Sequence, residues 1–209
     1  MKVKRKTNAS DLATEADRES EQAVLRTLNR AFPDHSILAE ESGTNAQRSE
    51  HRWIVDPLDG TTNFAHGFPQ FCVSIAYEHR GQVELAVVYD ALKRELFVAA
   101  RGRAAQRTAD PRERDALARP RATRDRLSVA CGRVDALWEL GPRPWDVAAG
   151  ALIVTEAGGQ VTNLDGSALD LDARKMLASK GKLHRAMRET ITKAWPEANR
   201  REAESRAAP

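Results

Sequence analysis

The sequence predicts a mixed α/β (α+β) fold, and three kinds of segment lead to this prediction. A long amphipathic helix is expected at residues 11–31. Three apolar strands joined by short turns follow at residues 71–100 and are typical of an antiparallel meander. A helix rich in small residues, at residues 145–157, lies among further short strands. A chain of 209 residues with these elements is expected to form one domain, or one and a half, with a substantial core.

Composition narrows the class of protein. Hydrophobic content of 41% and charged content of 30% are ordinary for a soluble globular chain. The net charge of +3 tolerates anionic partners without requiring nucleic acid. The basic N-terminus leads into no apolar signal segment, and no stretch reaches a membrane-spanning length, so we expect no membrane association and a cytoplasmic location. Cys72 and Cys131 lack a C-x-x-C context and are interpreted as reduced core thiols rather than a disulfide.

The first helix has an apolar stripe among charged residues, and Pro33 ends it. The stripe consists of Ala16, Ala23, Val24, Leu25 and Leu28. Asp17 lies on this helix and either reaches a site or faces water. We expect it to face water, because a charge on an amphipathic helix is usually solvated.

A brief strand is predicted at residues 36–39, with Glu40 and Glu41 at its polar exit. Adjacent glutamates usually belong to a solvated loop. Here they follow one strand and shortly precede another, and ligands collect at the ends of neighbouring strands in an open sheet. Glu40 is therefore predicted to bind a metal ion or to orient water.

Residues 53–64 hold the densest chemistry in the chain. An apolar strand at 53–55 is expected to stop abruptly at Pro57, which has no N–H and makes the turn stiff. Asp56, the Leu58 carbonyl and Asp59 can then direct oxygen atoms into one small volume, which suits Mg²⁺. A plain turn is the alternative, since Asp-Pro and Asp-Gly are common turn formers.

Gly60, Thr61 and Thr62 come next and carry no bulky side chains. If these residues open a helix, their N–H groups would form a site for an anionic phosphate. A metal site beside a phosphate site suggests phosphoryl chemistry. The histidines that follow, His66 and His79, have no spaced ligand partners and are interpreted as surface or turn residues.

The character of the chain changes at residues 101–126, where arginine recurs and large apolar side chains almost vanish. Such a segment cannot bury a face and is predicted to be a solvated loop or a disordered segment. An RNA-binding arm is the alternative, although no aromatic residue interleaves the charges. The segment divides the chain into residues 1–100, which carry the metal and phosphate elements, and residues 127–209, which would complete the site.

Regular structure is expected to return at residues 127–140, as a helical piece followed by a strand. Asp146 lies at the first turn of the small-residue helix, where an aspartate is most often only an N-cap. Short strands at 160–163 and 175–179 and a helix at 183–195 follow, and the charged remainder is expected to fray.

The stretch from Trp53 to Phe64 resembles the first signature of the inositol monophosphatase family, and the stretch from Trp145 to Gly159 resembles the second. The resemblance covers residues 11–100 and 129–187. It implies a layered α-β-α-β-α sandwich, Mg²⁺-dependent hydrolysis of phosphate monoesters of a small sugar or polyol such as inositol, inhibition by lithium, and a homodimer.

The resemblance also implies roles for particular residues. Glu40, Asp56 and the Leu58 carbonyl correspond to ligands of a first metal, and Asp56, Asp59 and Asp146 to ligands of a second. Thr61 and Glu40 would activate the attacking water, while the Gly60 and Thr61 N–H groups hold phosphate. Glu139 would contact a substrate hydroxyl, and Asp17 and Glu41 would support the metal ligands from behind.

The sequence departs from the family pattern in two places. A helix that precedes residue 11 in the family is missing, and the Arg-rich segment replaces a longer stretch with strands of the second sheet and a substrate-contacting turn. Two alternatives therefore stay open beside the phosphatase: a catalytically impaired protein that binds RNA or the transcription machinery, and a phosphatase for fructose bisphosphate or a nucleotide phosphate.

Overall fold

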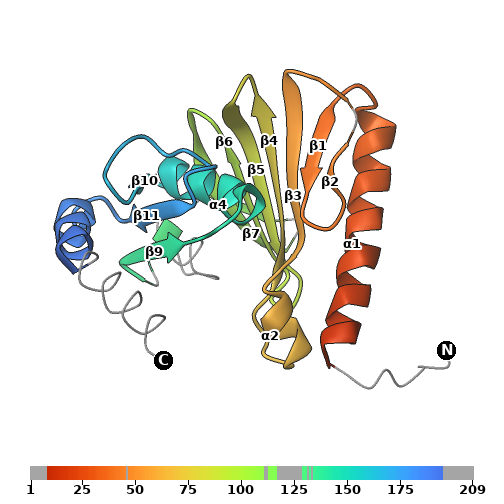
Figure 1. Ribbon diagram of the computed structural model, residues 1–209, viewed down its shortest axis with the longest axis horizontal. Coiled ribbons are helices and arrows are strands. Elements are labelled where there is room, and N and C mark those ends of the chain that lie inside the picture. The colour runs from red at the N-terminus through yellow and green to blue at the C-terminus, as the bar shows by residue number, and fades with distance from the viewer. Residues whose placement is uncertain are drawn as a thin grey trace, which may run out of the picture.

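The structure, a computed structural model, describes residues 9–45, 47–110, 113–116, 129–130, 132 and 134–194. Figure 1 shows the elements stacked in successive layers. The order is helix α1 (Ala9–Ala31), a large sheet, helix α4 (Pro144–Glu156), a small sheet, and the helical residues 184–194. The predicted α-β-α-β-α sandwich is therefore confirmed.

Most strands of the described chain are antiparallel to their neighbours. The large sheet has the order β2 (Gly43–Thr44), β1 (Ser36–Ala39), β3 (His51–Asp59), β4 (Cys72–His79), β5 (Gln82–Asp90), β6 (Glu95–Ala100), β7 (Arg103–Asp110) and β8 (Glu113–Ala116). The small sheet has the order β10 (Gln160–Asn163), β11 (Lys175–Ser179) and β9 (Ala136–Leu140). The short helix α2 (Thr61–Ala65) follows β3. Strands β4 to β6 form the predicted meander.

Strands β1 and β3 are the parallel pair of the large sheet, and this pairing positions the candidate site. Ala39 lies opposite Val55 in the register. The Glu40 N–H continues the ladder by donating to the Val55 carbonyl over 3.2 Å. The carboxyl ends of the two strands therefore meet, as expected from an open sheet, and Glu40 and Asp56 become neighbours.

Helix α4 lies between the two sheets, and its sequence explains why. Every residue from Val147 to Val154 is buried, and a helix that is apolar all round belongs inside a protein. Alanines and a glycine at positions 148–151 let strands approach from both sides. The side chains of Ile54 and Phe97, both at most 1% exposed, pack in the same core cluster. On the opposite face of the large sheet, Leu28 of α1 packs against Val55.

Gly159 explains the predicted Gly-Gly stop after α4. A Cβ atom there would lie 2.6 Å from Val154 Cγ1 and 2.8 Å from the Ser179 carbonyl oxygen. No side chain fits between the end of the helix and strand β11, so the close approach of α4 to the small sheet requires glycine. The preceding Gly158 has a φ of 83°, which favours glycine as well.

The prediction of a loop or disordered segment at residues 101–126 is wrong for its first part. Residues 103–110 form β7, which pairs with β6, and residues 113–116 form β8. Hydrogen bonds between backbones define these strands, so they need no large apolar side chains. Ala105 is 1% exposed and belongs to the same core cluster as the buried residues of α4. The other residues of the predicted segment, 111–112 and 117–126, lie outside the described residues.

Strand β3 does not stop at Pro57, as the sequence predicted, but continues to Asp59. The pairing of β3 with β4 shifts between Asp56 and Asp59, and the irregularity contains Pro57 and Leu58. A proline fits there because an irregular stretch does not require its missing N–H. The irregularity therefore lies between the two carboxylates that the sequence predicts as cation ligands.

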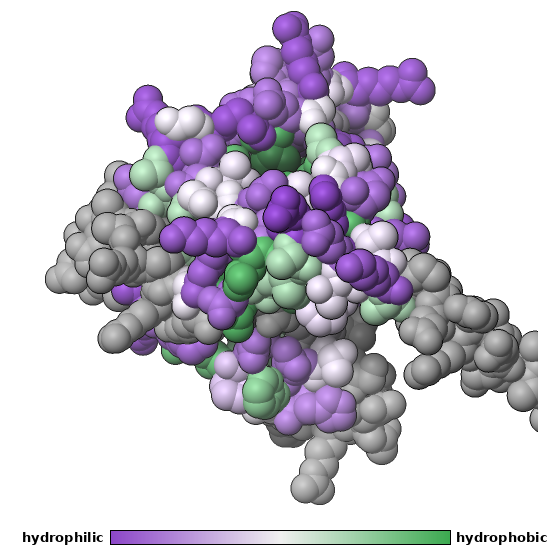
Figure 2. Space-filling view, turned by 90° about the vertical axis from the view of Figure 1, so that its left-hand side faces the viewer, coloured by the Kyte–Doolittle hydropathy of each residue, from purple (hydrophilic) through white to green (hydrophobic). Residues whose placement is uncertain are grey.

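The end of the molecule that carries residues 184–194 is largely hydrophilic, and the hydrophobic areas visible on it are small (Figure 2). Among the described residues, no helix combines the length and the apolar character needed to cross a bilayer.

His184 is a buried histidine whose protonation state follows from its neighbours. The Thr162 hydroxyl donates to the Asn163 carbonyl over 2.7 Å, so it must accept the bond from His184 Nε2 at 2.9 Å. Nε2 therefore carries the proton, and Nδ1 accepts from the Ser179 hydroxyl over 2.9 Å. Burial lowers the pKa of His184, with the Arg188 charge adding to the effect.

We expect this histidine to make stability depend on pH. Below its ordinary pKa of 6.5 the unfolded chain takes up a proton that the folded imidazole resists, so the free energy of unfolding should fall as the pH drops from 7 to 5. In chemical denaturation, His184→Gln should make this fall in stability smaller. The exposed His66→Gln serves as control. An unchanged slope for His184→Gln would contradict the assignment.

Candidate active site

Asp56 is the most deeply buried of the predicted site residues, with 1% of its surface exposed. The Leu58 N–H donates to its Oδ1 over 3.0 Å. Burial raises the pKa of Asp56 to about 9, and the nearby charges of Asp59, Glu40 and Asp146 act in the same direction. The four carboxyl groups therefore come close enough to influence one another, although they belong to three separate segments.

Glu40 lies beside Asp56, at the end of β1. Burial raises the pKa of Glu40 to about 7, and the charges of Asp17, Asp146 and Glu41 add to the effect. A hydrogen bond with the Asp56 carboxyl opposes the rise. The carboxyl groups of Glu40 and Asp56 are therefore close enough to interact directly.

Asp17 does not face water as the sequence predicted. It is 2% exposed, and its Oδ2 lies 3.1 Å from the Thr61 hydroxyl, which also lies 3.0 Å from the Leu58 carbonyl oxygen. Burial raises the pKa of Asp17 to about 6. Its Oδ1 is buried and has no hydrogen-bond partner. Helix α1 packs this residue against α2 and the end of β3, which explains why it leaves solvent.

Two further residues of α1 were missed by sequence reasoning. Glu21, 4% exposed, accepts the Glu41 N–H over 2.9 Å, and the Ser20 hydroxyl donates to the Pro57 carbonyl over 2.8 Å. These bonds hold the segments that follow β1 and interrupt β3. A signal existed, because Asp17, Glu21 and Leu28 lie on one helical face, where polar residues at core positions are unusual.

Gly60 and Thr61 form the start of α2, as predicted. Gly60 is the N-cap residue with a φ of 93°, a left-handed conformation that glycine adopts readily. Thr61 begins the helix, and its side chain lies between Asp17 and Leu58.

Asp146 approaches the cluster from α4. Its Oδ2 accepts the Arg143 N–H over 2.6 Å, so the carboxylate caps the helix in which it lies. Its charge nonetheless raises the pKa of both Glu40 and Asp56. The capping role predicted for Asp146 is confirmed, although Arg143 is the N-cap residue, and the cap leaves the Asp146 carboxylate near Glu40 and Asp56.

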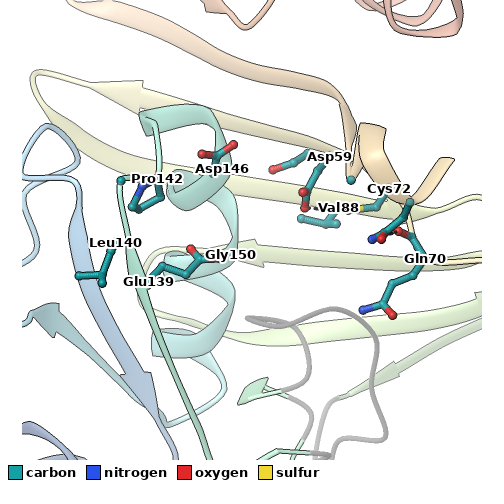
Figure 3. Close-up of a pocket in the computed structure, with 13 residues that line it drawn as sticks. Asp59, Gln70, Cys72, Val88, Glu139, Leu140, Pro142, Asp146 and Gly150 are labelled. Carbon is teal, nitrogen blue, oxygen red and sulfur yellow. Dashed lines mark hydrogen bonds between the residues drawn. The ribbon is translucent and has the colours of Figure 1, made fainter. Parts of the chain in front are cut away.

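A cavity of about 290 Å³ connects these elements. Figure 3 shows Asp146 on α4 and Asp59 at the end of β3 on opposite sides of it, with Glu139 of β9 near α4. The complete lining is Asp59, Gly60, Asn63, Gln70, Cys72, Ser74, Val88, Glu139, Leu140, Gly141, Pro142, Asp146 and Gly150. Glu40 and Asp56 are not among the lining residues.

The fit of this cluster to divalent cations rests on its chemistry. Its donors are carboxylate and carbonyl oxygens, which hard cations prefer. Burial, with repulsion among the carboxylates adding to it, raises the pKa of Glu40 and Asp56. Within the described part of the chain, however, no three His, Cys, Asp or Glu side chains converge into a metal-binding group as they stand. The residues suit such ions by the chemistry of their donor atoms.

Comparison with known proteins decides the family. The family model "Inositol monophosphatase family" matches residues 1–119 and 114–199. This chain belongs to that family. It is 37% identical over 236 aligned positions to an inositol-1-monophosphatase of Synechocystis sp., with 93% of this chain and 82% of the relative covered.

Two further relatives agree with this assignment. The Nus factor SuhB of Pseudomonas aeruginosa is 35% identical, with coverage of 90% of this chain and 86% of the relative. The solved inositol monophosphatase of Anabaena (Nostoc) sp. superposes with a TM-score of 0.77 at 35% identity, covering 88% of this chain and 91% of that structure. Relatives named inositol monophosphatase and relatives named Nus factor SuhB thus both resemble this chain.

We expect the carboxylate cluster to destabilise the fold when no cation is present. Glu40 and Asp56 hold protons when folded at pH values where ordinary carboxyl groups have released them, so stability should fall as the pH rises from about 5 to 9. In EDTA at pH 8, Asp56→Asn should raise the free energy of unfolding by roughly 2 kcal/mol.

The control is Asp135→Asn, which alters an exposed ion pair with Lys180 and should change little. Chemical denaturation at pH 6 and pH 8 measures both variants. A loss of stability for Asp56→Asn at pH 8 would show that the cluster is not under repulsion.

Proposed function

We propose that this protein is a Mg²⁺-dependent phosphomonoesterase that hydrolyses inositol monophosphate or a similar small sugar or polyol phosphate. The observation that carries the proposal is the mutual influence of Glu40, Asp56, Asp59 and Asp146 beside one cavity. Membership of the inositol monophosphatase family supports the reaction class. The cavity volume of about 290 Å³ suits a small substrate.

The acidic residues would hold two cations. Glu40, Asp56 and the Leu58 carbonyl would bind one, and Asp56, Asp59 and Asp146 the other. Bound Mg²⁺ would neutralise phosphate charge and lower the pKa of the attacking water. A calcium-bound family protein of Staphylococcus aureus, 26% identical with a TM-score of 0.75, supports divalent-cation binding in this fold.

The chain's own groups would orient the reaction. The Thr61 hydroxyl, which donates to Asp17, would orient a water molecule, and the Glu40 carboxylate would take up the proton that the water loses. The water oxygen forms a bond to phosphorus as the bond to the ester oxygen breaks, and the departing alkoxide takes up a proton. The Gly60 and Thr61 N–H groups would hold the phosphate oxygens. Glu139, on the far wall of the cavity, would accept a hydrogen bond from a substrate hydroxyl.

The direct test is phosphate release from inositol 1-phosphate with and without Mg²⁺. We expect EDTA to abolish release, lithium to inhibit it, and Asp59→Asn to lower kcat at least roughly 100-fold, because the substitution removes a carboxylate from the cation site. Asp135→Asn, a change at an exposed residue that directly precedes β9, is the matched control. Hydrolysis that ignores both EDTA and Asp59→Asn would refute the proposal.

A second candidate function is binding to RNA or to the transcription machinery. Relatives named Nus factor SuhB favour it, as do the arginines of residues 101–126, although this segment is described only in part. Binding should then persist in Asp59→Asn and weaken with added salt. RNA electrophoretic shifts and co-purification with RNA polymerase, measured on the wild type and on Asp59→Asn, separate this function from catalysis.

A third candidate keeps the chemistry and changes the substrate to fructose bisphosphate or a nucleotide phosphate. A family protein described as bound to 2′AMP, 26% identical with a TM-score of 0.75, supports the nucleotide case. Comparing kcat/KM across inositol 1-phosphate, fructose 1,6-bisphosphate and 2′AMP distinguishes the three. The highest value identifies the preferred substrate class.

A further inference from the structure

Cys72 lies opposite one of the candidate cation ligands. It begins β4, and the register that follows the irregularity in β3 pairs it directly with Asp59. The thiol is 2% exposed and is not part of a disulfide, which confirms the predicted reduced thiol at this position. Its Sγ lies 3.5 Å from Asp59 Oδ2, within the range of a hydrogen bond to sulfur.

The direction of this bond follows from the chemistry of the two groups. An ionised carboxylate only accepts, and a thiol is a weak donor that ordinarily stays protonated at neutral pH. Cys72 therefore donates to Asp59, and it does so from a backbone position fixed by the β3–β4 ladder. A donor held in this way restricts rotation of the carboxylate about its last side-chain bond.

We propose that Cys72 is a positioning residue, whose thiol sets the orientation of the Asp59 carboxylate toward the cavity. The inference rests on the proposed function, in which Asp59 binds a cation. Both residues line the same cavity, so the thiol contacts the Asp59 carboxylate at the wall of the site (Figure 3). Removing a residue that hydrogen-bonds to a metal ligand typically lowers metal affinity or activity by about 10- to 100-fold.

The test separates hydrogen bonding from packing with two substitutions. Cys72→Ser keeps a hydroxyl donor, whereas Cys72→Val fills the buried volume and has none. We expect Cys72→Val to lower kcat and to weaken Mn²⁺ binding, each roughly tenfold, with KM nearly unchanged. Cys72→Ser should stay within about threefold of the wild type in both measurements. Electron paramagnetic resonance of Mn²⁺ titrations gives affinity without reference to catalysis.

Crystal structures of the wild type and Cys72→Val supply a readout that requires no activity. The Asp59 carboxylate should rotate in Cys72→Val and keep its orientation in Cys72→Ser. If the wild type is active and Cys72→Val matches it in kcat, Mn²⁺ affinity and Asp59 orientation, the positioning role is refuted and the proposed function stands. If the wild type hydrolyses no ester while Asp59 still rotates in Cys72→Val, the proposed function fails and the positioning role stands.

Discussion

Electrostatic repulsion among carboxylates is the constraint on which this structure depends. Four carboxylates come from three distant segments of the chain: Glu40, Asp56, Asp59 and Asp146. Burial, with the repulsion between these neighbours, raises the pKa of Glu40 and Asp56. Such a cluster opposes folding, so the surrounding structure must hold the carboxylates together. Three local structures impose it: the parallel β1–β3 pair, the irregularity in β3, and the first turn of α4. The core on both faces of α4 offsets the cost.

Helix α1 contributes to the candidate site as well as to the core. Its contact face carries Leu28, but also Asp17, Ser20 and Glu21, which bond to the chain around the cluster. Polar groups at such positions sacrifice apolar contact, and proteins accept this loss where function requires a fixed arrangement. Helix α1 thereby fixes Thr61, the segment after β1 and the Pro57 carbonyl relative to one another.

Features encoded by neighbouring residues could be predicted from the sequence, and features set by distant packing could not. The α1 helix, the β4–β6 meander, the strand before Glu40 and the small-residue helix at Asp146 follow from local periodicity and stop signals. The burial of Asp17 depends on α2, 44 residues further along the chain, to which its Thr61 bond reaches. Strand β7 was missed for a related reason, because pairing with β6 rather than its own apolar content defines it.

Asp146 both caps helix α4 and brings a negative charge close to Glu40 and Asp56. As the third residue of α4, it accepts the Arg143 N–H, and that bond fixes its carboxylate at the end of the helix. The same fixation brings its charge to Glu40 and Asp56, which belong to the sheet on which α4 packs. Because α4 is buried between two sheets, its first turn can move little. The family assignment across a chain with a shortened second sheet is consistent with this, since the cluster depends on the large sheet and α4 rather than on the strands beyond them.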